Sequence, residues 1–170
     1  MHPAADARAP MNMANMKSPE AYTDVFERLE REGVRYVVVS GVAVVLRGRV
    51  RPVFDLDIVV DPAPDESARA LRALLGAGFV PSIPLPLSVV SVMRTFDNAG
   101  REVDLFTRYH IPFEALWADA EHVPVGGGVA RVVSLEHLLR AKRINGRPHD
   151  LEDIAGLLAL EAGGMGKEPA

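Results

Sequence analysis

The stretch from Val37 to Val60 constrains the fold more than any other part of the sequence. An apolar run ends at Ser40-Gly41, and a second apolar run then carries Asp55 and Asp57, two residues apart. Because side chains alternate along a strand, both carboxylates project from the same face. Neighbouring carboxylates repel one another, and a bound cation relieves that repulsion. The stretch therefore predicts a strand, a turn, a short helix and a second strand that bears two acidic groups.

Ser40-Gly41 predicts a tight turn between the first strand and the short helix. Glycine tolerates a positive φ and a close approach of other groups, so we expect Gly41 to supply the freedom that this turn needs. Backbone N–H groups at such a turn, together with the Ser40 hydroxyl, can bind phosphate oxygens. The alternative is a plain turn in which Ser40 caps the helix. A phosphate-binding turn beside paired carboxylates is typical of phosphoryl-type transfer.

The composition favours a soluble globular protein with one domain. The chain has 170 residues, of which 48% are hydrophobic and 25% charged, and this length allows a sizeable core. The net charge of −4 argues against broad electrostatic binding of nucleic acid, and the absence of cysteine excludes a disulfide framework. No apolar run is long enough to span a membrane and the N-terminus does not resemble a signal peptide, so we expect a cytoplasmic protein without membrane contact.

The remaining patterns predict alternating helices and strands. Helices are expected at residues 18–32, 41–47, 65–75, 112–118, 134–144 and 148–160. Strands are expected at residues 34–39, 54–60, 89–96, 102–106 and 129–133. The strands at 89–96 and 102–106 should pair antiparallel through the Asp97–Gly100 turn, and the proline-rich segment 80–87 is expected to be a loop. We therefore expect an α+β domain over residues 18–162, with a mixed sheet flanked by helices and flexible tails at 1–17 and 163–170.

Asp104 and a late basic segment could complete a site. Asp104 lies in an apolar strand, where a carboxylate is out of place unless it faces a rim or a cation. If that strand neighbours Asp55 and Asp57, the three carboxylates could hold Mg²⁺ or Mn²⁺, and Asp104 becomes a candidate general base. The alternative is that Asp55 and Asp57 pair with nearby arginines and Asp104 caps a turn. Lys142 and Arg147 could likewise point at a triphosphate or be ordinary surface charges.

Together these motifs resemble the nucleotidyltransferase superfamily, which has the DNA polymerase β-like fold, and in particular small bacterial proteins related to the AbiEii toxins. The matching residues are Ser40-Gly41-Val42-Ala43, Arg47-Gly48, Arg51, Asp55-Leu56-Asp57, Lys142, Gly146-Arg147 and Asp150. The sequence departs from the usual pattern at Ser40, Arg47 and Val53, where those proteins carry Gly, His and Thr. None of these departures removes an acidic residue of the motif.

The resemblance implies a nucleotidyltransferase-like mixed sheet with C-terminal helices. It also implies an enzyme that moves a nucleoside monophosphate from an NTP to a hydroxyl, with Mg²⁺ or Mn²⁺ on the catalytic residues Asp55, Asp57 and Asp104. The nucleotide-binding residues that it implies are Ser40, Gly41, Arg51, Lys142, Arg147 and Asp150.

The resemblance leaves the acceptor and the biological role open. The acceptor could be an RNA end such as that of tRNA, a protein or a small molecule. A toxin of a toxin–antitoxin or phage-defence pair, with an antitoxin or partner subunit, follows by analogy with the family. The alternatives are a catalytically weak nucleotide-binding or regulatory protein, and an interaction subunit that keeps the fold.

Overall fold

A mixed β-sheet forms the middle of the molecule in the computed structural model, which describes residues 13–165. Among these residues the sheet has seven strands in the order β3-β4-β5-β2-β1-β7-β6. The strands are β1 (Tyr36–Val39), β2 (Leu56–Val60), β3 (Val80–Pro81), β4 (Val92–Phe96), β5 (Glu102–Phe106), β6 (Glu121–Val125) and β7 (Gly128–Val132). The α-helices are α1 (Thr23–Arg31), α2 (Ser40–Leu46), α3 (Pro64–Gly76), α4 (Phe113–Asp119), α5 (Leu135–Asn145) and α6 (Pro148–Met165). The α+β class and the mixed sheet expected from the sequence are confirmed.

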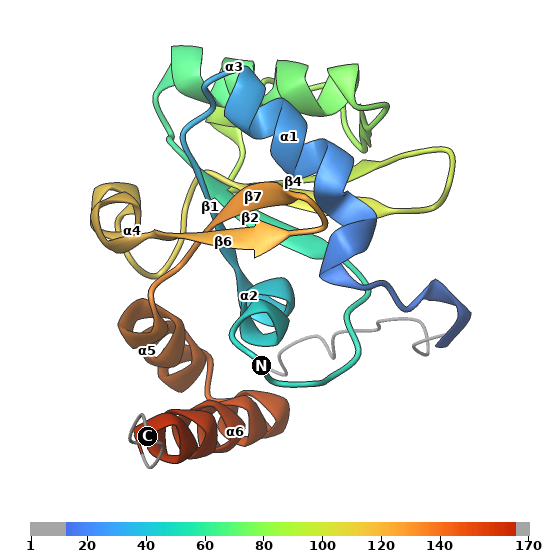
Figure 1. The fold of residues 1–170 in the computed structure, drawn as a ribbon. Coiled ribbons are helices and arrows are strands. Elements are labelled where there is room, and N and C mark those ends of the chain that lie inside the picture. The colour runs from blue at the N-terminus through green and yellow to red at the C-terminus, as the bar shows by residue number, and fades with distance from the viewer. Residues whose placement is uncertain (1–12, 166–170) are drawn as a thin grey trace, which may run out of the picture.

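Helices lie on both sides of this sheet. In Figure 1, α1 and α3 lie above the sheet, and α2, α5 and α6 lie below it. Helix α1 packs against β7 and α3, whereas α2 packs against β1, β2 and α5. The buried core includes Tyr22, Phe26 and Leu29 from the α1 side, and Ile58 and Leu105 from the central strands. None of the helices within residues 13–165 is long and apolar enough to cross a membrane.

The register of the central strands positions the acidic residues. Strand β2 runs antiparallel to β1 and parallel to β5, so that Val39 pairs with Asp57 and Asp57 pairs with Asp104. Directly paired residues of neighbouring strands project from the same face. Strand β1 ends at Val39, and the turn that begins at Ser40 therefore lies beside Asp57.

Several elements agree with the expected ones. Strands β4 and β5 pair antiparallel across the turn that contains Asp97 and Gly100. The Ser134 hydroxyl accepts a hydrogen bond from the His137 amide and caps α5, which ends before Gly146 in the left-handed conformation. These two signals are local, which is why the sequence was enough to predict them.

The structure corrects other boundaries. Residues 19–22, expected in the first helix, form the 3-10 turn η2 (Pro19–Tyr22). Segment 80–87 is not wholly a loop, because it contributes the edge strand β3 and the first residue of the 3-10 turn η3 (Leu87–Val89). Strand β6 was not expected, since it is a mostly exposed edge strand that includes Pro124 and lacks a clear apolar alternation.

The two ends of the chain extend the expected domain. Helix α6 continues to Met165, three residues past the predicted end of the domain at residue 162. Most of the predicted N-terminal tail, residues 1–17, lies outside the described residues. Its last part forms a 3-10 turn, η1 (Met13–Asn15), and the Lys17 amide donates to the Val53 carbonyl at 2.6 Å.

Candidate active site

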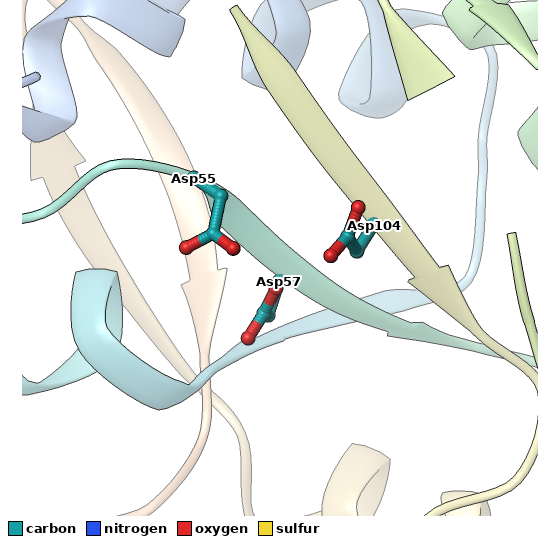
Figure 2. Close-up of side chains that lie close together, drawn as sticks. All are labelled: Asp55, Asp57 and Asp104. Carbon is teal, nitrogen blue, oxygen red and sulfur yellow. The ribbon is translucent and has the colours of Figure 1, made fainter. Parts of the chain in front are cut away.

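Three carboxylates meet where β2 and β5 lie side by side. Asp55 immediately precedes β2, Asp57 lies within it, and Asp104 lies opposite Asp57 in β5 (Figure 2). One oxygen from each carboxylate lies within 4.8 Å of the other two. Asp104 is buried, whereas Asp55 and Asp57 are half-buried. The three side chains that the sequence singled out are therefore brought together, and Asp104 lies in a strand rather than capping a turn.

The environment of Asp104 disfavours the charged form of its carboxyl group. Its pKa is raised to about 8, most strongly by burial and then by the charges of Asp57, Glu102 and Asp55, while Arg94 opposes the shift. Arg94 lies across from Asp104 in the β4–β5 register, but its Nε is 4.0 Å from Asp104 Oδ2. Asp104 Oδ1 is buried and has no hydrogen-bond partner among the described residues. At neutral pH such a carboxyl group is mostly protonated, and a nearby cation would favour its ionised form.

The donor set fits a hard divalent cation. Sites built from carboxylate oxygens suit Mg²⁺, Mn²⁺ and Ca²⁺, whereas softer metals favour imidazole and thiolate ligands. A divalent ion would offset the three like charges and give the buried Asp104 Oδ1 a partner. Asp55, Asp57 and Asp104 are therefore the residues that would hold such an ion.

The turn next to the carboxylates differs from the expected one. Ser40, with φ of 59°, takes the left-handed conformation that the sequence assigned to Gly41, and Val39 rather than Ser40 is the N-cap residue. The left-handed region costs a non-glycine residue about 1–2 kcal/mol. Gly41 is not left-handed, and a Cβ there would lie 3.5 Å from Arg51 Nη2, an ordinary contact distance, so Arg51 lies against the turn without requiring glycine. Backbone strain of this kind is concentrated at functional sites, which agrees with the position of the turn beside Asp57.

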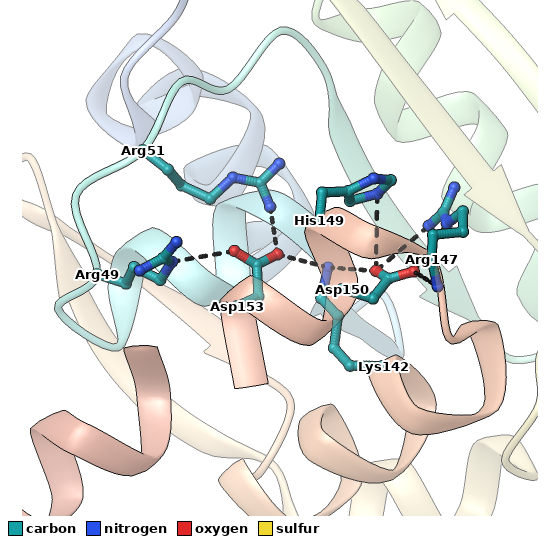
Figure 3. Close-up of polar contacts among 7 residues, drawn as sticks. All are labelled: Arg49, Arg51, Lys142, Arg147, His149, Asp150 and Asp153. Atoms are coloured by element: carbon teal, nitrogen blue, oxygen red, sulfur yellow. Dashed lines mark hydrogen bonds and ion pairs between the residues drawn. The ribbon is translucent and has the colours of Figure 1, made fainter. Parts of the chain in front are cut away.

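A buried ion network holds the basic residues next to this turn (Figure 3). Asp153 of α6 accepts from Arg49 Nε at 3.1 Å and from Arg51 Nη1 at 2.6 Å, and its Oδ2 lies 3.0 Å from Lys142 Nζ. Lys142 also donates to Asp150 Oδ1 at 3.2 Å. Lys142, Asp150 and Asp153 are 5%, 0% and 2% exposed. The network therefore ties α5 and α6 to the segment that leads into β2.

Arg147 completes this network at the start of α6. Its Nε donates to Asp150 Oδ2 at 2.8 Å, and its backbone amide donates to the same oxygen at 3.2 Å. Burial disfavours ionisation of Asp150, but the hydrogen bonds from Arg147 and Lys142 outweigh it and hold the pKa of Asp150 below its usual range. Four cationic side chains thus face two carboxylates, which leaves the network with an excess of positive charge near Gly41.

The predicted nucleotide-binding residues therefore fall into two groups. Ser40 and Gly41 form the turn beside the carboxylates, with Arg51 lying against Gly41. Lys142, Arg147 and Asp150 lie in the ion network instead. The arginines near the acidic pair make ion pairs elsewhere: Arg49 and Arg51 with Asp153, and Arg47 with Glu121 at 3.2 Å.

Sequence reasoning missed two residues of this region. Asp153 lies three residues after Asp150, so both project from the same side of α6, and this spacing could have identified it. Tyr109 links the two groups of residues, because Asp57 and Ser40 on one side and Asp150 and Arg147 on the other all act on its hydroxyl. Its pKa is raised to about 12, most strongly by burial and then by the charge of Asp57, while a side-chain hydrogen bond with Ser40 lowers it. No local sequence pattern around Tyr109 indicates a functional role, because these four residues are distant from it in the sequence and are brought to it by the fold.

Comparisons with known proteins agree with this architecture. No protein-family model matches the sequence, and a comparison with curated proteins gives no match. The structure is similar to that of the lincosamide antibiotic adenylyltransferase LnuA with lincomycin bound, at 18% identity and a TM-score of 0.61, covering 84% of this chain and 97% of the other.

Two further solved structures show the same likeness. One is a protein from Thermotoga maritima assigned as a nucleotidyltransferase, at 18% identity and a TM-score of 0.57, covering 82% of this chain and 91% of the other. The other is an antigenic nucleotidyltransferase-like protein from Paracoccidioides brasiliensis, at 16% identity and a TM-score of 0.59, covering 84% of this chain and 76% of the other. From these likenesses and the sheet topology we conclude that the chain has the nucleotidyltransferase-like fold.

Proposed function

We propose that the protein is an enzyme that transfers a nucleoside monophosphate from an NTP to a hydroxyl group and releases pyrophosphate. The observation that carries this proposal is the three-carboxylate cluster, whose oxygens lie within 4.8 Å of one another beside the Ser40-Gly41 turn. The fold supports it, because one structural neighbour is named as an adenylyltransferase. Asp55, Asp57 and Asp104 would be the catalytic residues and the ligands of Mg²⁺ or Mn²⁺.

The nucleotide would lie over the turn, with its triphosphate against Arg51. Arg51 is half-buried, lies against Gly41 and makes an ion pair with Asp153 that fixes its guanidinium. A guanidinium fixed in this way offers its remaining N–H groups to phosphate oxygens without having to be ordered first. Ser40, Lys142, Arg147 and Asp150 would complete the site, the last three by shaping and charging its wall through the ion network.

Transfer requires an oxygen–phosphorus bond to form at the α-phosphorus while the bond from that phosphorus to the pyrophosphate oxygen breaks. We assign the proton of the attacking hydroxyl to Asp104, through the carboxylate oxygen that would not bind the ion. A divalent ion on the three carboxylates would neutralise charge on the phosphates and lower the pKa of the attacking hydroxyl. Catalysis of this type depends mainly on positioning and charge neutralisation.

The biological role is proposed by analogy only, and one observation favours a second candidate function. The resemblance to AbiEii-related proteins supports a cytoplasmic toxin of a toxin–antitoxin or phage-defence pair, with an antitoxin as partner. A second candidate is a nucleotide-binding protein without turnover, which the strained Ser40 in place of glycine favours, because it alters the turn next to the carboxylates.

Labelled nucleotides separate these functions. Each NTP would be supplied with the label on either the α- or the γ-phosphate, together with Mg²⁺, total cell RNA, lysate protein and the small-molecule fraction. Transfer of the α-label alone supports nucleotidyl transfer, and Asp57→Asn should abolish it, whereas Asp65→Asn on the exposed start of α3 should not. Transfer of the γ-label would instead show a kinase-type reaction. Nucleotide binding without transfer of either label would favour the second candidate.

A further inference from the structure

A cavity of about 540 Å³ lies farther along β2 than the three carboxylates, with Val59 and Tyr109 in its lining. We propose that it binds the acceptor, and that the acceptor is a small molecule that joins an apolar ring to a hydroxyl group. This inference rests on the proposed nucleotidyl transfer and adds to it the class of the second substrate. Its volume lies in the range of small-molecule pockets, roughly 300–1,000 Å³.

The sheet places this cavity next to the catalytic carboxylates. Val59, which lines the cavity, lies two residues after Asp57 on the same face of β2. Two residues of a strand span about 6.6 Å. Tyr109 lines the cavity as well, and it interacts with both the charge of Asp57 and the hydroxyl of Ser40. A molecule in the cavity would therefore reach the carboxylates with one end.

The far wall of the cavity is apolar and rigidly held. Ile111 and Phe113 line it, and the Phe113 ring stacks on Trp117 with a centroid separation of 5.9 Å. The Arg35 guanidinium lies 5.2 Å from the Phe113 ring and 5.0 Å from the Trp117 ring. A preformed aromatic and aliphatic wall of this kind suits a ring-bearing ligand.

The charges of the lining argue against a nucleic acid acceptor. Of the described residues that line the cavity, only Arg108 is cationic. Asp61 and Glu114 also line it, and Arg35 pairs with both of them. Binding of a polyanion depends on several lysines or arginines at the phosphates. Of the basic residues in the ion network, Arg51 is the one that lies against Gly41. The triphosphate would therefore lie against Arg51, and the acceptor against the apolar wall of Ile111 and Phe113.

The acceptor hydroxyl and the α-phosphate of the NTP would meet at the three carboxylates. The acceptor oxygen forms a bond to the α-phosphorus of the NTP, and the bond from that phosphorus to the β-phosphate oxygen breaks. Pyrophosphate leaves with the electron pair of that bond, and the hydroxyl proton passes to Asp104. The products are a nucleotidylated small molecule and pyrophosphate.

Pro112 allows the cavity to be filled without disturbing the core. It lines the cavity and is exposed, at the position before α4. Pro112→Phe should occlude the cavity, and Ala118→Phe is the matched control, because it adds the same ring at an exposed position of α4 that does not line the cavity. The wild type and both variants would be incubated with α-labelled NTP, Mg²⁺ and three fractions of one cell extract: small molecules below about 1 kDa, total RNA and protein.

We expect label in the small-molecule fraction, at least tenfold less of it with Pro112→Phe, and near-normal labelling with Ala118→Phe. The labelled species should be retained on a reversed-phase column. A second readout does not depend on turnover: Trp117 is the only tryptophan in the sequence, so the unlabelled compound purified from that fraction should change the fluorescence of the wild type but not of Pro112→Phe.

Several results would overturn the assignment. Label on RNA or protein would identify a macromolecular acceptor, and equal labelling by Pro112→Phe and Ala118→Phe would place the acceptor outside the cavity. No label in any fraction, with Mg²⁺-dependent NTP binding intact, would equally refute a small-molecule acceptor. Loss of NTP binding in the wild type would mark a different failure, that of the proposed function itself.

Discussion

Replacement of Lys142 by methionine tests the buried ion network that joins α5 and α6 to the site. The Lys142 ammonium is held between Asp150 and Asp153, at 3.2 and 3.0 Å, and the side chain is 6% exposed. Methionine keeps much of the side-chain volume but removes the charge, so Asp150 and Asp153 each lose one cationic partner while they stay buried. Removal of one partner of a buried ion pair costs about 3–5 kcal/mol. Because Arg51 and Arg147 still bind the two carboxylates, we expect the lower end, about 3 kcal/mol.

Urea unfolding followed by circular dichroism at pH 7 measures this loss. A loss of that size lowers the melting temperature of a chain of this length by about 6–12 °C. Arg143→Met is the matched control, since Arg143 is exposed in the same helix, and it should change the free energy of unfolding by less than about 0.5 kcal/mol. A loss below about 1 kcal/mol for Lys142→Met, or equal losses for both variants, would refute the reasoning.

The difference in the free energy of unfolding between wild type and Lys142→Met should depend on pH. The pKa of Asp150 is held below its usual range by Arg147 and Lys142 against the effect of burial. A carboxylate with a lowered folded-state pKa stabilises the protein above its unfolded pKa, and this stability is lost as the pH falls through the folded pKa. The difference between wild type and Lys142→Met should therefore narrow in acid. A difference that stays constant down to the acid transition would contradict this account.

Three further predictions concern the site itself. Ser40→Gly should be more stable than Ser40→Ala by about 1 kcal/mol, because glycine alone takes the left-handed conformation without strain; equal urea midpoints would contradict this. Arg51→Lys should weaken Mg²⁺-dependent NTP binding about tenfold in a calorimetric titration, since lysine lacks the planar fork that can bind Asp153 and phosphate together; unchanged affinity would remove Arg51 from the nucleotide site. In EDTA the free energy of unfolding should fall as the pH rises from about 5 to about 8.5. The folded-state pKa of Asp104 is raised to about 8, so over this range the folded state binds a proton more tightly than the unfolded state, and this stabilisation is lost as the pH rises. Thermal melts should show a smaller loss for Asp104→Asn, and an equal loss would contradict the assignment.

The positions of Asp55, Asp57 and Asp104 could be predicted because each signal is local to one strand. A carboxylate in an apolar strand is conspicuous, and a spacing of two residues fixes a shared face. The sequence did not show that the strand of Asp104 lies next to the strand of Asp57, because strand order depends on the whole sheet. The three-carboxylate site could therefore be predicted only on the condition that the two strands are neighbours. The structure meets the condition through the parallel pairing of Asp57 with Asp104.

Other features depend on contacts that the sequence does not display. The left-handed residue is Ser40 rather than Gly41 because Val39 is the last residue of β1 paired with β2. Lys142 was expected to point at a triphosphate or to be a surface charge, yet it is buried between two carboxylates of another helix. Strand β6 gains its order from pairing with β7, not from a pattern of its own.

Metal-dependent nucleotide binding tests the central claim most directly. Calorimetric titration with each NTP, as an analogue that cannot be cleaved between the α- and β-phosphates, would compare wild type with Asp57→Asn and with the exposed control Asp65→Asn. The three-carboxylate site predicts saturable binding of at least one nucleotide in Mg²⁺ by the wild type and by Asp65→Asn. It also predicts loss of that binding in EDTA and in Asp57→Asn. Binding that is equal with Mg²⁺ and with EDTA, or that Asp57→Asn leaves unchanged, would contradict the assignment of this site.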